Sequence, residues 1–445
     1  MNYLIPVTPK RASQIASSLV FRSYIQFTSR PNHTYTSRHN NSGPLSGVKI
    51  LDLTRVLAGP FCTQILADYG ADVVKVEHPN GGDDTRLWRE AGEEIIWRPE
   101  ATNTSIYFNT INRNKRSIAV NLKDEKGREI IFELTRKADV VVENFIPGKL
   151  DKLGLGYEAL KAVNPSIILA SISGYGADGP FSRRAGYDVI GAAEGGLLHI
   201  TGEADGPPTK PGVGLMDMCT GLYLHGAIVS ALLAREKTGI GQKIDTSLFE
   251  TTISILANVG MSWINLGKEA QRWGTAHPTI VPYEAFKTKD SFLVVGAVNN
   301  RQFSNLCKLL GNEDLANDPQ FVDNNARVQN RKDLKRILDG LFVTRTTEEW
   351  EKVFEGSGMP YGPINTLEKV FSHPQALARN MVETVEQNEA VSGKVKVLGM
   401  PVKFSHSKPS IREGPPLLGQ HTEEVLQELG LSSDTILELR KAAVI

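Results

Sequence analysis

Short apolar runs rich in β-branched residues alternate with amphipathic segments in the first half of the chain. The strand-like runs cover residues 47–53, 71–79, 139–145 and 166–174. Between them, residues 61–70, 125–138 and 157–165 carry apolar side chains at helical spacing. Strands that alternate with helices in this way predict an α/β fold with a mostly parallel sheet.

The pattern changes further along the chain and predicts several domains. Residues 221–266 are largely helical and apolar, and a second, smaller region with strands followed by helices begins near residue 282. We therefore expect a large α/β domain over 44–235, a helical linker over 236–265, and a small α/β domain over 266–370. Residues 371–445 are expected to return to the large domain.

Ligands of parallel α/β sheets bind at the carboxyl ends of the strands. The loops of interest are therefore residues 54–60, 77–86, 143–148 and 174–188. The first loop, TRVLAGP, lacks the glycine fingerprint of dinucleotide-binding sheets, and a Walker-type phosphate loop is also absent from the sequence. The sheet is expected to bind something other than NAD or a nucleoside triphosphate in the usual mode.

The overall charge is balanced, which excludes some classes of partner. Lys plus Arg and Asp plus Glu each total 50, so no global field attracts nucleic acid or an anionic membrane surface. No apolar run is expected to span a bilayer. The three cysteines lie far apart, and no Cys or His spacing predicts a metal site.

The N-terminal residues differ from the rest of the chain. Met1–Leu51 contain no Asp or Glu, and residues 1–43 contain five Lys or Arg residues among many Ser and Thr. This composition is typical of an organelle transit peptide. Residues 1–43 are therefore interpreted as a mitochondrial leader, which predicts the mitochondrial matrix; a basic tail without a targeting role is the alternative.

Two acidic residues are candidates for chemistry. Asp188 precedes a glycine-rich apolar segment, and Asp217 lies within GLMDMCTG. Either residue has the sequence context of a helix cap. The residue pattern alone does not show which of these two acids is catalytic.

Seven blocks, in order from residue 47 to the C-terminus, resemble the class III CoA-transferase family. They begin with GVKILDLTRVLAGP and include NRNKRSIAVNLK, VENFIPGKL, SISGYGADGP, RAGYDVIGAAEGGLLHITG, REKTGIGQKIDTSLFE and PPLLGQHTEEVLQELG. The resemblance implies a Rossmann-like large domain and an interlocked homodimer. It also implies that CoA thioesters are substrates and that the enzyme needs no cofactor or metal.

The resemblance assigns roles to individual residues. Asp188 would be the nucleophile that forms an aspartyl anhydride and then an aspartyl-CoA thioester. The CoA-contacting positions would be Val56, Leu57, Ala58, His78, Val120, Lys123, Asn144, Phe145, Lys152 and Leu153. Gly195 and Gly196 would offer amides to an oxyanion, and Arg272 and His277 would bind the acceptor carboxylate. Similarity to one subgroup of the family around RWGTAHP implies succinyl-CoA as the donor. The same similarity implies glutarate as the acceptor, with other dicarboxylic acids as alternates.

Two other functions remain open. An acyl-CoA racemase on the same fold would use a His–Asp pair, whereas Tyr187 precedes Asp188 here and favours transfer. A non-catalytic CoA-binding protein is the second alternative, and the retained Asp188 argues against it.

Overall fold

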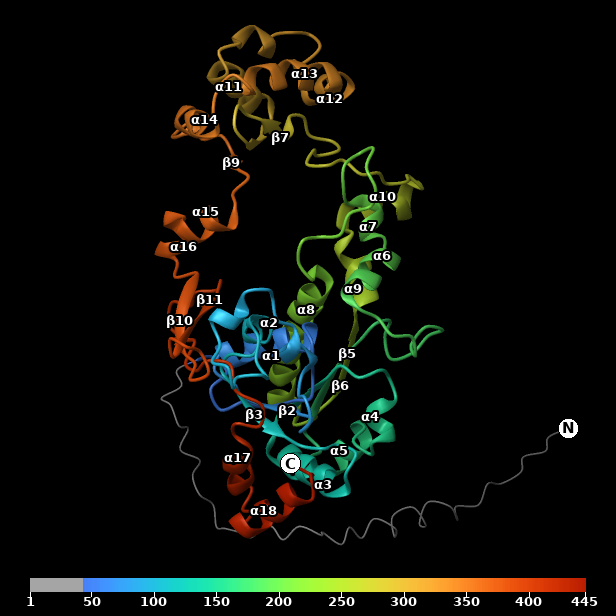
Figure 1. The fold of residues 1–445 in the computed structure, drawn as a ribbon. Helices are drawn as coiled ribbons and strands as arrows, with labels where there is room; N and C mark the ends of the chain where they lie inside the picture. The colour runs from blue at the N-terminus through green and yellow to red at the C-terminus, as the bar shows by residue number, and fades with distance from the viewer. Residues whose placement is uncertain (1–42) are drawn as a thin grey trace, which may run out of the picture.

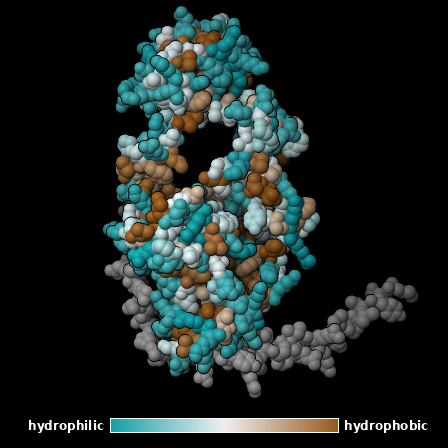
Figure 2. All heavy atoms as spheres, viewed as in Figure 1, coloured by the Kyte–Doolittle hydropathy of each residue, from teal (hydrophilic) through white to brown (hydrophobic). Residues whose placement is uncertain are grey.

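The structure, a computed structural model, describes residues 43–445. The predicted leader, apart from Gly43, lies outside these residues. Figure 1 shows a large domain and a small domain joined by two separate arms. The space-filling view shows an opening through the molecule between the arms (Figure 2). The chain therefore forms a ring.

A six-stranded parallel sheet is the centre of the large domain. Its strand order is β3 (Lys115–Ala119), β2 (Asp72–Glu77), β1 (Lys49–Asp52), β4 (Val140–Glu143), β5 (Ile168–Ser173) and β6 (Lys243–Ser247). This is the order of a Rossmann-type sheet, and the strand order reverses between β1 and β4. The predicted parallel α/β sheet is confirmed.

Alternating strand residues build a core on each face of the sheet. Leu51 and Val141 face one side with residues of α3 (Glu125–Lys137) and α5 (Tyr157–Val163). Ile50 and Val140 face the other side with residues of α1 (Ala58–Asp68) and α8 (Leu215–Thr238). Both faces are thus covered by helices, as a parallel sheet requires.

The two edge strands were not predicted. β3 lies in NRNKRSIAVNLK, a basic run that contains Arg113, Lys115, Arg116 and Lys123. β6 lies inside residues 236–265, the segment expected to be a helical linker. The expectation of a helical linker was therefore wrong at residues 243–247, and no strand was expected at residues 115–119. Both strands are rich in polar residues and so lack the apolar pattern that predicts a buried strand. Lys115 in β3 can be fully buried because its ammonium binds Asp52 (3.1 Å), Asn112 Oδ1 (2.9 Å) and the Pro60 carbonyl (2.9 Å), contacts that sequence periodicity does not reveal.

The 24-residue helix α8 is long and apolar enough, by length and composition, to cross a membrane. The expectation that no such segment exists was therefore wrong on that criterion. In this fold, Leu224 and Ile228 of α8 are fully buried against the core residues Cys62 and Leu66 of α1. The helix thus serves as the core helix of a sheet face.

The small domain has an antiparallel sheet of β7 (Tyr283–Lys287), β8 (Phe292–Gly296) and β9 (Tyr361–Pro363). Its helices are α11 (Asn300–Leu309), α12 (Asn324–Gln329), α13 (Arg331–Phe342) and α14 (Thr347–Phe354). The rings of Phe286 and Phe342 stack at 4.6 Å, and Trp350 packs beside them. This core is separate from the cores of the large domain.

Two arms connect the domains. One contains α6 (Asp188–Glu194), α7 (Leu197–Ile200), α9 (Leu248–Ile255) and α10 (Ala257–Leu266). The other contains α15 (Leu367–Ser372), α16 (Pro374–Ala378), β10 (Val382–Glu386) and β11 (Lys394–Leu398). From the second arm the chain reaches α17 (Thr422–Glu428) and α18 (Ser433–Lys441), whose apolar residues share a core with Leu51.

Candidate active site

A cleft of about 190 Å³ opens at the carboxyl ends of β1, β2, β3 and β4. It lies where the strand order reverses, which is the expected ligand site of such a sheet. The structure brings five of the predicted CoA-contacting residues together in its walls: His78, Val120, Lys123, Phe145 and Leu153. Residues up to 75 positions apart in the sequence thus line one apolar cleft with a basic rim.

Positive charge at this cleft comes from few residues. Lys123 and Lys149 line it, and both are exposed without an ion-pair partner within residues 43–445. The other three basic residues of the run NRNKRSIAVNLK are neutralised: Arg113 by Asp68, Lys115 by Asp52, and Arg116 by Asp72 and Glu428. The basic run is therefore chiefly structural, and Lys123 is its one member at the cleft.

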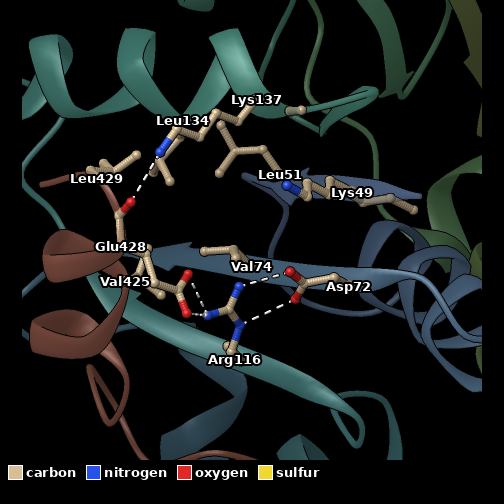
Figure 3. Close-up of a pocket in the computed structure, with 12 residues that line it drawn as sticks. Lys49, Leu51, Asp72, Val74, Arg116, Leu134, Lys137, Val425, Glu428 and Leu429 are labelled. Carbon is tan, nitrogen blue, oxygen red and sulfur yellow. Dashed lines mark hydrogen bonds and ion pairs between the residues drawn. The ribbon is translucent and has the colours of Figure 1, made fainter. Parts of the chain in front are cut away.

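A second cavity lies at the opposite, amino-terminal edge of the sheet (Figure 3). Its volume is only about 40 Å³, and the Arg116 guanidinium spans it between Asp72 and Glu428. A space of this size holds little more than a water molecule. The cleft at the carboxyl ends is the candidate ligand site because it lies where the strand order reverses.

The first loop joins this cleft to the predicted nucleophile. Asn144 after β4 binds both backbone groups of Arg55, donating to its carbonyl (2.7 Å) and accepting from its amide (3.1 Å). Leu57 then packs against Gly214, where an added Cβ would lie 2.8 Å from Leu57 Cδ2 and 3.7 Å from Asp188 Oδ1. Asn144 thus supports the loop, a role that its sequence position did not indicate.

Asp188 lies at the start of α6, and its carboxylate meets the amino end of a second helix. Its Oδ1 accepts hydrogen bonds from the backbone amides of Met216 (2.7 Å) and Asp217 (3.1 Å) in the first turn of α8. Helix N-termini stabilise negative charge. Within the part of the chain that the structure describes, Oδ2 has no hydrogen-bond partner, so one carboxylate oxygen is anchored and the other is free.

Asp217, the other candidate acid, has a different environment. Burial, and secondarily the charge of Asp188, raises its pKa to about 7. Burial and the charges of Asp217 and Asp188 also raise the pKa of Tyr107 in α2 (Ile106–Thr110). Sequence reasoning missed Tyr107, because nothing near it in the sequence indicates its proximity to these acids.

The predicted oxyanion glycines do not present free amides. The Gly195 amide donates to Gly191 O (2.9 Å) and the Gly196 amide to Ala193 O (3.2 Å) at the carboxyl end of α6, away from Asp188. A Cβ on Gly195 would lie 2.4 Å from Thr252 Cγ2, so this glycine permits close helix packing. The structure therefore argues against the oxyanion role. The α8 amides that bind Asp188 Oδ1 are the candidate oxyanion donors instead.

The predicted acceptor residues lie on the arm and the small domain. The Arg272 guanidinium donates to the carbonyls of His199 (3.1 Å) and Glu203 (3.3 Å). The His277 ring stacks on Tyr283 with centroids 5.7 Å apart. No contact within residues 43–445 joins either residue to Asp188, so their role stays a prediction. Lys152, also predicted to bind CoA, is exposed at the end of α4 (Lys149–Lys152).

No group of three or more His, Cys, Asp or Glu side chains within residues 43–445 has an arrangement that would hold a metal ion.

Comparisons of sequence and fold with known proteins give a consistent result. The sequence model of CoA-transferase family III matches residues 45–422. The chain is 51% identical to the succinyl-CoA:glutarate CoA-transferase of Mus musculus, over 87% of this chain and 86% of that protein. It is 48% identical to the Homo sapiens protein of the same name, over 94% and 93%. Among solved structures, a CAIB/BAIF family protein from Brucella suis matches with a TM-score of 0.77 and 41% identity, over 87% of this chain and 99% of that one.

Proposed function

Since this chain belongs to CoA-transferase family III, we propose that it moves CoA from succinyl-CoA to glutarate, with Asp188 as the covalent nucleophile. The observation that carries the proposal is the Asp188 carboxylate, whose Oδ1 is held by two α8 amides while Oδ2 is free. The names of the two mammalian relatives support the donor and the acceptor.

The first half of the reaction transfers CoA to the enzyme. Asp188 Oδ2 attacks the thioester carbonyl of succinyl-CoA, the C–S bond breaks, and CoA leaves as a thiolate. The thiolate then attacks the aspartyl carbonyl of the mixed anhydride, the C–O bond breaks, and succinate leaves. An aspartyl-CoA thioester remains, and covalent catalysis has replaced one difficult exchange by two easier steps.

The second half reverses this order. A glutarate carboxylate attacks the aspartyl-CoA carbonyl and expels the thiolate, which forms an aspartyl–glutaryl anhydride. The thiolate attacks the glutaryl carbonyl, and glutaryl-CoA and the Asp188 carboxylate are released. No proton is gained or lost overall, so the residues do not need to supply a general base.

The α8 amides have a specific part in these steps. When the thiolate attacks the aspartyl carbonyl, negative charge develops on the oxygen derived from Oδ1. The amides of Met216 and Asp217 already point at that atom. Preorganised backbone donors of this kind stabilise an oxyanion without reorganisation.

The CoA moiety is proposed to occupy the cleft at the sheet edge. Lys123 and Lys149 would meet its phosphate groups, and the apolar walls formed by Val120, Phe145 and Leu153 would contact its less polar parts. The thioester would then reach Asp188 past Leu57.

The test is a matrix of acyl-CoA donors against carboxylic acceptors, read by mass spectrometry. Purified protein with succinyl-CoA and glutarate should form glutaryl-CoA and succinate in equal amounts. A strong preference for formate, oxalate or carnitine as acceptor would overturn the proposed substrates. Exchange of the α-hydrogen of a 2-methylacyl-CoA with D₂O, without transfer, would instead support the racemase.

A further inference from the structure

The backbone of the first loop is held on each side by side chains that come from other parts of the sheet edge. The Lys75 ammonium donates to Thr54 O (2.8 Å), and the Val56 amide donates to Asp83 Oδ1 (3.1 Å). Asn144 holds the peptide groups of Arg55 between them. Three consecutive residues are thus fixed by tertiary contacts and not by secondary structure.

Val56 needs such support because its backbone is strained. Its φ is 68°, in the left-handed region. A β-branched residue is disfavoured there, because its Cβ crowds the backbone. Such conformations persist only where the surroundings determine them, and they concentrate at functional sites. The hydrogen bond from the Val56 amide to Asp83 is the tertiary contact made at the strained residue itself.

Asp83 is itself rigidly placed. Its Oδ2 pairs with Lys75 Nζ at 2.9 Å, and the side chains of both residues are almost completely buried. Burial opposes both charges, but Lys75 holds the pKa of Asp83 below its ordinary value, and the charges of Asp83 and Asp52 raise the pKa of Lys75. Both groups are therefore ionised at neutral pH and form a fixed anchor between β2 and the first loop.

This anchor connects the two parts of the candidate site. Asp83 and the adjacent Gly82 line the cleft proposed for CoA. The residue after Val56 is Leu57, which packs against Gly214 beside Asp188. A change in the backbone at Val56 would therefore move Leu57 relative to the nucleophile.

We infer that Asp83 is a positioning residue of the transfer reaction, which, paired with Lys75, holds Val56 in its left-handed conformation and so places Leu57 and Ala58 between the CoA cleft and Asp188. The inference rests on the proposed function. Asp83 acts through the loop and not on the substrate.

A double-mutant cycle between Asp83 and Val56 tests the inference. Misplaced reacting groups cost about 100-fold in rate, so D83N is expected to lower kcat/KM for succinyl-CoA by roughly that factor. Glycine adopts positive φ without a Cβ penalty. In the V56G background the same D83N change should therefore cost about tenfold or less.

D68N is the matched control. Asp68 is also a buried carboxylate and pairs with Arg113 at 2.6 Å, but it does not contact the first loop. Its substitution should lower the melting temperature yet leave kcat/KM per folded protein unchanged. Equal effects of D83N in the two backgrounds, with an active wild-type enzyme, would overturn the inference. A wild-type enzyme that forms no glutaryl-CoA would instead overturn the proposed function.

The V56P variant provides a second test of the inference if D83N does not fold. Proline fixes φ near −65° and removes the amide that binds Asp83, but it leaves the Lys75–Asp83 pair intact. The variant should fold and should lose about 100-fold in kcat/KM relative to V56G, since the loop is forced out of position. Equal kcat/KM values for folded V56P and V56G would refute the role of this conformation.

Discussion

At the scale of single residues, Asp188 makes the contacts of a helix cap and is also the proposed nucleophile. Asparagine can accept the same two α8 amide hydrogen bonds, so D188N should fold with little loss of stability. An amide cannot form the anhydride, and turnover should therefore fall by about 10³-fold or more. Glutaryl-CoA formation and thermal melting measure the two effects.

The trapped intermediate provides a separate check on Asp188. Hydroxylamine added to the wild-type enzyme with succinyl-CoA should modify the peptide that contains Asp188, because anhydrides and thioesters react with it. Modification of Asp217 or Glu194 would show that the wrong carboxylate was assigned. Glu194 is expected to stay unmodified, since it binds Arg184 (2.7 Å) and Tyr175 (2.8 Å).

Asp217 should make stability depend on pH. Its pKa of about 7 lies above that of an aspartate in the unfolded chain, so the folded state binds the proton more tightly. That contribution to stability is complete below the unfolded pKa and is lost as pH rises through 7. D217N removes it. The variant should therefore gain melting temperature relative to wild type as pH increases from 5 to 8; a constant difference across this range would contradict the prediction.

At the scale of elements, the amino end of α8 has to approach both the first loop and α6. Gly214 precedes the helix, and a Cβ there would push on the Leu57 side chain beside Asp188. G214A should fold, because the far end of a leucine can move, but kcat/KM should fall by about tenfold through displaced contacts.

The neighbouring Gly212 offers the matched control for G214A. A Cβ on Gly212 would meet no atom within 4 Å, and its backbone lies outside the left-handed region. G212A should therefore keep wild-type kinetics. Equal losses in the two variants would mean that flexibility of the segment, and not contact at Leu57, explains the effect.

At the scale of the whole molecule, the ring and its exposed apolar arm favour a homodimer. The opening between the arms is visible in Figure 2. Trp263, Ile264 and Leu266 of α10 are 55%, 73% and 75% exposed in the single chain. Such surfaces usually mark an interface. We expect sedimentation equilibrium to give twice the chain mass, and W263E and I264E to weaken the assembly; a stable wild-type monomer at micromolar concentration would refute it.

The predicted leader is tested independently of the fold. Residues 1–43 lack acidic side chains and contain five basic ones, which suits mitochondrial import. A fluorescent protein fused to these residues should colocalise with mitochondria. The same fusion with its Lys and Arg residues replaced by Gln should stay cytosolic, whereas a cytosolic wild-type fusion would contradict the assignment.

The sequence by itself determined the buried strands and the main helices, because periodic apolar positions report local structure. It also limited the candidate nucleophiles to a few acids, and seven ordered blocks indicated the family. It did not reveal strands β3 and β6, because their polar residues resemble those of a solvent-exposed segment. Lys115 shows the reason: its charge is compensated by Asp52, 63 positions away, which no local pattern records.

Only the tertiary structure decided how the site is assembled. Asp188 meets amides 28 and 29 positions further along, and Asn144 supports a loop 89 positions earlier. The tertiary structure also indicates the amides at the start of α8 as candidate oxyanion donors, in place of those of Gly195 and Gly196. Hydrogen bonds and ion pairs between distant segments depend on how the sheet and helices pack, so their partners become known only once the chain is folded.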